Sequence, residues 1–260
     1  HGGVDAGVAA GHFMARLAGQ GSESTHEGAA DAENVYVHAG ILRLQPPLCV
    51  HGQLSKVKQN AAMDAMKEEV AATAARLVVE EGLEYGAAKR RAVKQLGLSA
   101  RGGLPDNDQV EVAVREYIAL FCADTQPAEL RALREVALQW MERLARFRPH
   151  LAGAVWHGTA TRLSDIYLQL FCDDPKSAEI GLIDMGVRFD ATTVTGFQGE
   201  PVEALSVHVC VPALGASVGL HLMVYDFDDL RGALKPDSRG RRPRGDLAAL
   251  RSLLHDGAHD

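Results

Sequence analysis

With 260 residues, 47% of them apolar, the chain can form one large or two modest domains around a substantial core. Its formal net charge of −7 gives the whole molecule no general attraction for nucleic acid, so such binding would need a local basic patch. No apolar run reaches the roughly 20 residues that a transmembrane helix requires. The four cysteines form no Cys-x-x-Cys pair, which argues against a zinc site and a disulfide framework. We therefore expect a soluble, cytoplasmic protein.

Residues 1–60 differ in composition from the rest of the chain. They are rich in glycine, hold five of the 11 histidines and show almost no periodicity. Regular patterning begins near Met63. We expect this segment to be a disordered extension, or translated sequence upstream of the true start.

Residues 61–126 have the pattern of a helical subdomain. Apolar residues recur at steps of three and four from Ala61 to Leu96, with an interruption at residues 80–82. Asp106 or Asn107 can cap a further helix that ends near Cys122.

The basic helix expected at residues 85–96 offers one route to nucleic acid. Together with the Leu-Gly-Leu-Ser that follows, it resembles the start of a helix-turn-helix of the tetracycline-repressor type. The resemblance implies a DNA-binding regulator. The chain then continues with Arg-Gly-Gly-Leu-Pro at residues 101–105, where a recognition helix should begin. The alternative is a solvated basic face on a helical hairpin.

Residues 127–260 alternate between helical and strand patterns. A long amphipathic helix with Pro127 in its first turn should end at Pro149. The strands are expected at residues 151–156, 164–171, 187–194, 204–211 and 217–225, with helices at 176–185 and 246–254. Helices followed by a small mixed sheet predict an α+β fold.

The second of these strands combines a core face with a polar face. Ile166, Leu168 and Leu170 alternate with Asp165, Tyr167 and Gln169, so the two sets point to opposite sides of the sheet. A carboxylate on a strand is unusual unless water or a ligand reaches it. Asp165 is therefore the centre of the predicted site.

The sequence around Asp165 resembles a known family signature. Gly158-Thr159, a short spacer and Ser164-Asp165-Ile166-Tyr167-Leu168 are similar to the Gly-Ser, spacer, Ser-Asp-Ile-Asp-Leu pattern of the nucleotidyltransferase superfamily of the DNA polymerase beta type. The likeness is best over residues 127–174. It implies a nucleotidyltransferase-like sheet and an enzyme that moves a nucleoside monophosphate from a nucleoside triphosphate to an acceptor, which the sequence leaves unidentified.

The resemblance also implies the roles of individual residues. Asp165 would be catalytic and would hold Mg²⁺ or Mn²⁺, since hard cations need oxygen ligands. The nucleotide phosphates would be bound by the residues of the preceding turn, which are Gly158, Thr159, Thr161 and Ser164.

Two positions depart from the family pattern. Tyr167 stands where the second aspartate should be, and the polar faces of the later strands carry His208 and His221 instead of a third carboxylate. A mixed metal site of Asp165, Tyr167 and His208 would suit a softer metal than magnesium. The alternative is a catalytically degenerate member that serves as a binding or regulatory module.

The stretch from residue 231 to residue 244 is basic and rich in proline and glycine. Its arginines could contact a phosphate of a nucleotide or nucleic acid, because the guanidinium fork matches phosphate oxygens. The alternative is a solvated linker.

Overall fold

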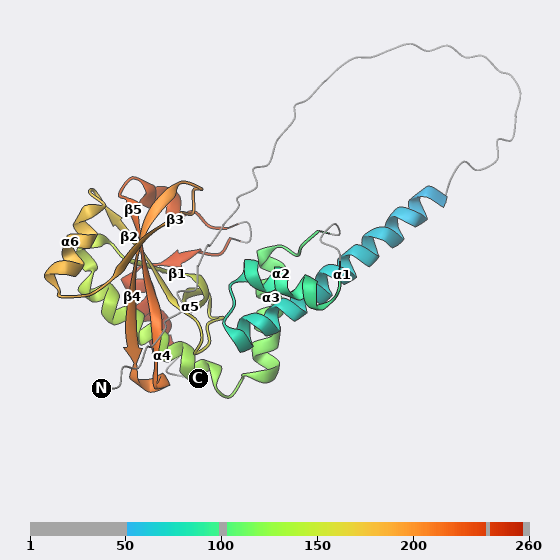
Figure 1. Cartoon of the computed structure of the whole chain (residues 1–260), viewed down its shortest axis with the longest axis horizontal. Coiled ribbons are helices and arrows are strands. Elements are labelled where there is room, and N and C mark those ends of the chain that lie inside the picture. The colour runs from blue at the N-terminus through green and yellow to red at the C-terminus, as the bar shows by residue number, and fades with distance from the viewer. Residues whose placement is uncertain (1–50, 99–102, 238–239, 257–260) are drawn as a thin grey trace, which may run out of the picture.

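The computed structural model describes residues 51–98, 103–237 and 240–256, with side chains from residue 61 onward. A helical part and an α/β part lie side by side (Figure 1). The predicted N-terminal extension lies mostly outside the described residues. Where it meets them, helix α1 (His51–Glu81) begins at His51 and not near residue 61, so the expected boundary at residue 60 falls within a helix.

Three helices form the helical part, as the apolar periodicity predicted. Helices α2 (Tyr85–Gln95) and α3 (Asn107–Phe121) pack on the C-terminal half of α1, while its N-terminal half extends away from the body (Figure 1). Asp106 caps α3 through the amide of Gln109 at 2.7 Å. The small core contains Val70, Ala74, Leu77, Ala88, Ala92, Val110, Val114 and Ile118.

Helix α4 (Gln126–Arg143) links the two parts and supplies the main core of the α/β part. Pro127 lies in its first turn, as expected, because that position needs no amide donor. A short 3-10 helix, η2 (Ala145–Phe147), follows. The buried stripe of α4 packs against the sheet with Leu133, Val136, Ala137, Trp140 and Met141.

The sheet has six strands in the order β3-β4-β5-β2-β1-β6. Their bounds are β1 (His150–Ala152), β2 (Ile166–Cys172), β3 (Asp190–Thr195), β4 (Pro201–Val211), β5 (Ala216–Asp226) and β6 (Arg244–Gly245). Strand β2 pairs parallel with β5, and the other neighbours pair antiparallel. The mixed sheet after the helices confirms the predicted α+β class.

The structure corrects the strand expected at residues 151–156. Strand β1 ends at Ala152, and helix α5 (Gly153–His157) occupies the rest. Gly153 has φ +70°, a left-handed conformation that glycine adopts without strain, and it turns the chain out of the sheet. An uncharged apolar run of this length does not distinguish a strand from a buried helical turn.

Two further predicted helices are present in the predicted order, whereas short helical turns at residues 212–214 and 229–233 were not predicted. Helix α6 (Lys176–Asp184) and helix α8 (Leu247–Asp256) pack with α4 on one face of the sheet. A 3-10 turn, η3 (Pro212–Leu214), joins β4 to β5, and a short helix, α7 (Asp229–Ala233), lies at one end of the opposite face. Among the helices of residues 51–256 that are described, none has the length and apolar character to cross a membrane.

Candidate functional site

The strand register places one row of polar side chains across the sheet. Tyr167 of β2 lies opposite His221 of β5, His221 lies opposite Ser206 of β4, and Ser206 lies opposite Asp190 of β3. Residues that pair across a sheet point to the same face. This face lies opposite the one that α4, α6 and α8 cover, and we call it the open face.

Asp165 immediately precedes β2 and is held by two hydrogen bonds. The Gly219 amide donates to Oδ1 at 2.8 Å, and Nε2 of His221 lies 3.2 Å from Oδ2. Burial raises the pKa of the Asp165 carboxyl, but the hydrogen bonds from His221 and Gly219 outweigh burial and hold the pKa below its ordinary value. Asp165 is therefore ionised at neutral pH.

Gly219 makes this arrangement possible because it has no side chain. A Cβ at this position would lie 2.8 Å from the Asp165 Oδ1 atom and 2.9 Å from His221 Nε2. Any other residue would displace the carboxylate from its two donors.

His221 connects Asp165 to Ser206. Its Nδ1 atom lies 2.9 Å from the Ser206 hydroxyl. In the neutral ring, the ionised carboxylate accepts a hydrogen bond from Nε2–H, which leaves Nδ1 as the acceptor for the Ser206 O–H. Asp165 thus fixes the tautomer of His221 and the orientation of the serine hydroxyl.

Tyr167 of β2 lies between the Asp165 site and the helical part. Its hydroxyl donates to Glu84 Oε1 at 3.0 Å, and Glu84 lies between α1 and α2. The ring stacks on His221 with a centroid distance of 5.0 Å and lies 3.5 Å from where a Cβ on Gly153 would be. Burial, and then the negative charge of Glu84, raise the pKa of the Tyr167 phenol, which keeps the hydroxyl protonated.

The residues predicted to bind phosphate form a turn after α5. Gly158 has φ +83° and its carbonyl accepts from the Gln126 side chain at 3.1 Å. Thr159 and Thr161 are buried, and the Ser164 hydroxyl accepts from the Thr161 amide at 3.0 Å. Phosphate binding by Gly158, Thr159, Thr161 and Ser164 stays a prediction.

The residues around Asp165 do not fit a magnesium or manganese ion. Both Asp165 oxygens accept hydrogen bonds. The Tyr167 hydroxyl donates a hydrogen bond to Glu84, and a protonated phenol is a poor metal ligand. His208 lies on the same face and lowers the pKa of Asp165 by its charge. It offers a nitrogen ligand, however, whereas magnesium is bound by oxygens. Within the described residues no group of three or more His, Cys, Asp or Glu side chains is placed to hold a metal.

Two residues of this site were not predicted, and His221 was predicted on the polar face without a contact to Asp165. His221, and not His208, contacts Asp165, because the parallel pairing of β2 with β5 sets His221 beside Tyr167. Ser206 carries no sequence signal beyond its place on a polar face. Glu84 comes from a loop 83 positions from Tyr167, and nothing in the local pattern indicates that contact.

The two basic segments use much of their charge within the protein. On α2, Lys89 donates to Asn107 at 2.8 Å, and Arg91 pairs with Glu81 at 2.6 Å. In the segment from 231 to 244, Arg241 binds Glu111 of α3 at 2.7 Å. Arg241 therefore anchors this segment on the helical part, whereas Arg231, Lys235 and Arg242 are exposed, so the solvated-linker alternative fails at Arg241 and holds for these three residues.

Comparison with known proteins finds no matching family model, no matching curated protein and no matching solved structure. The function must therefore be inferred from the geometry.

Proposed function

We propose that the chain is a nucleotidyltransferase-like binding or regulatory module that does not carry out metal-dependent nucleotidyl transfer. The observation that carries the proposal is the hydrogen bond from Tyr167 to Glu84 at the position of the second metal-binding aspartate. A neutral phenol whose hydroxyl is directed at Glu84 is a poor replacement for the carboxylate that a hard cation needs beside Asp165.

The architecture supports the family likeness. A long amphipathic helix, α4, precedes β1, a short helix follows it, and Asp165 lies directly before β2 on the open face. A long amphipathic helix before the glycine-containing turn is what the resemblance implies for the start of the domain, whereas α5 replaces most of the first strand that the sequence predicted. The likeness therefore concerns the scaffold, while the side chains on it differ from the catalytic pattern.

Metal binding at this position would require existing contacts to break. A cation on Asp165 would compete with the Gly219 amide and the His221 ring for the carboxylate oxygens. Each such bond to a charged group contributes about 1.5–3 kcal/mol. The site therefore stabilises its own side chains without a metal.

Active transfer remains the second candidate, because Asp165 is ionised and lies on the open face, as a metal ligand should. The two candidates differ in one property. Nucleotidyl transfer requires nucleotide binding that depends on both a divalent metal and Asp165. The binding module does not require such metal-dependent binding.

Calorimetry with each of the four nucleoside triphosphates distinguishes them. The titrations use Mg²⁺, Mn²⁺ or EDTA, on the wild type and on Asp165→Ala. We expect no metal-dependent component in the wild type. Metal-dependent binding that is lost in Asp165→Ala would overturn the proposal and favour the transferase.

A gain-of-function variant makes the test sharper. Tyr167→Asp restores the family pattern and removes the bond to Glu84, so it should introduce metal-dependent binding if the scaffold retains a phosphate site. Glu84→Gln, which weakens the same bond without adding a ligand, is the matched control.

A further inference from the structure

Arg244 of β6 is a buried arginine without a carboxylate partner. Its side chain reaches across the open face, where Nη1 donates to the Gln169 side chain of β2. It is 8% exposed and forms no ion pair with any residue of the described ranges. The guanidinium lies over the Phe197 ring, with 4.4 Å between Cζ and the ring centroid. Because burial of an unpaired charge is costly, a buried cation is ordinarily compensated by an anion.

Two buried donors beside Phe197 have no acceptor. The Arg244 Nε atom and the Tyr225 hydroxyl are two of the three buried side-chain polar atoms that lack a hydrogen-bond partner in the described part of the chain. Tyr225 is 2% exposed, and burial raises the pKa of its phenol, so the hydroxyl keeps its proton. Buried donors without an acceptor are rare in native proteins. Both atoms therefore indicate a bound acceptor.

The strand register brings these donors together on the open face. Phe171 follows Gln169 by two positions on β2 and lies opposite Tyr225 of β5, so all three side chains point to one face. The Tyr225 ring contacts the Phe197 ring at 4.7 Å between centroids, and Phe197 also contacts Arg244. The charge of Arg244 opposes the rise in the Tyr225 pKa, which agrees with their placement as neighbours.

We propose that Arg244 and Tyr225 bind a small monovalent anion of the size of chloride. The site offers one positive charge, since burial lowers the pKa of the nearby His150 imidazole and leaves that ring neutral at pH 7. Phosphate or sulfate would bring more negative charge than Arg244 balances. A water molecule would satisfy the two donors but would leave the guanidinium charge uncompensated.

Such an ion would have a structural role. It would join Arg244 of β6 to Tyr225 of β5 beside Phe197, which lies in the loop between β3 and β4. Strand β6 has two residues and pairs only with β1. The ion would therefore help to hold this short edge strand on the sheet.

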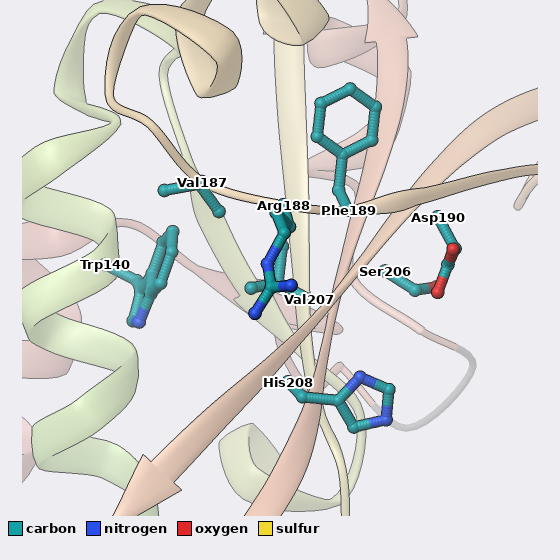
Figure 2. Close-up of a pocket in the computed structure, with 8 residues that line it drawn as sticks. All are labelled: Trp140, Val187, Arg188, Phe189, Asp190, Ser206, Val207 and His208. Atoms are coloured by element: carbon teal, nitrogen blue, oxygen red, sulfur yellow. The ribbon is translucent and has the colours of Figure 1, made fainter.

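A second arginine, at the opposite edge of the sheet, provides a matched control. A cavity of about 430 Å³ there is lined by residues that include Trp140, Arg188, Asp190 and His208. Figure 2 shows Arg188 projecting between Trp140 and His208. Arg188 is exposed, so water balances its charge, whereas water cannot do so for the buried Arg244.

Thermal unfolding in sodium bromide, chloride or gluconate at one ionic strength tests the site. Gluconate has the same charge as the halides but is too large for a site closed by Phe197. The halide shift is the unfolding midpoint in halide minus the midpoint in gluconate. The wild-type shift should exceed that of Arg244→Met by about 2 °C or more, and it should saturate with halide concentration. Arg188→Met should keep the wild-type shift. Equal shifts in the wild type and Arg244→Met would overturn the proposal.

Tyr225→Phe tests the second donor and decides the question if Arg244→Met does not fold. This variant keeps the charge of Arg244 and removes one hydroxyl. The halide concentration that gives half of the shift should rise several-fold, because one of the two donors is lost. An unchanged concentration would overturn the role of Tyr225 and with it the site.

Anomalous diffraction from crystals grown in bromide locates the ion. We expect a bromide peak in contact with Arg244 Nε and Tyr225 Oη. A water molecule at that position, or bromide only at exposed arginines such as Arg188, would overturn the proposal. The inference does not rest on the proposed function: metal-dependent nucleotide binding through Asp165 would overturn that function and leave the anion site intact.

Discussion

Strand β2 presents two faces that differ in how strongly the structure holds them. On one face Ile166, Leu168 and Leu170 are fully buried under α4, α6 and α8. On the other, Asp165 depends on two hydrogen bonds from residues of β5, and Tyr167 on one hydrogen bond to the helical part. The core face fixes the fold, and substitutions around Asp165 and Tyr167 should cost less stability than substitutions in the core.

The largest effect should come from the core face. Leu168→Ala removes a fully buried side chain at the centre of the sheet and should lower the free energy of unfolding by about 2–5 kcal/mol. Urea denaturation followed by circular dichroism measures this. A loss below about 1 kcal/mol would contradict the tight packing of this face.

Gly219→Ala should have the next largest effect, on the open face. The added Cβ would lie 2.8 Å from the Asp165 carboxylate, so Asp165 must leave both of its donors. The expected loss is about 1–3 kcal/mol, without damage to the core. Gly86→Ala is the control: it lies on α2, where an added Cβ would meet only the end of the Arg90 side chain at 3.5 Å, an ordinary contact, and it should stabilise the protein by up to about 1 kcal/mol.

Asp165→Asn should produce a pH-dependent loss of stability. A carboxyl whose pKa is lower in the folded state stabilises the fold above its unfolded pKa of about 4, and this contribution disappears as the pH falls through the folded pKa. The wild type should therefore exceed Asp165→Asn in stability at pH 7, and the difference should vanish in strong acid. Urea titrations at several pH values measure it, and a constant difference would contradict the low pKa.

Tyr167→Phe should have the smallest effect, about 1 kcal/mol, because it removes one hydroxyl and keeps the ring on His221. A double-mutant cycle with Glu84→Gln isolates the coupling. Tyr117→Phe, which removes a similar bond to Glu80 within the helical part, is the matched control. Only the Tyr167 variant should change proteolytic cleavage between the two parts.

The sequence predicted the elements better than the site. Steps of three and four located the helices, and alternation assigned Leu168 and Asp165 to opposite faces of one strand. It failed at residues 153–157, where a glycine with positive φ turns an apolar run into a helix.

The site depends on information that a local pattern lacks. The alternation of apolar and polar residues gives the face of the sheet on which His208 and His221 lie. Only the strand register shows which residues are neighbours across the sheet, and it places His221 beside Tyr167. The contact between Tyr167 and Glu84 depends on how the helical part docks. The missing second aspartate, by contrast, was visible in the sequence.

The two tryptophans of the chain lie at two different docking points. Trp140 stacks under the Arg143 guanidinium at 4.3 Å and lines the cavity, whereas the Trp156 indole donates to the Arg242 carbonyl at 2.8 Å and packs against Gly245. Each single-tryptophan variant therefore contains one built-in optical probe. Emission from Trp140 would follow the packing of α4 on the sheet, and emission from Trp156 would follow release of the C-terminal segment, without an added label.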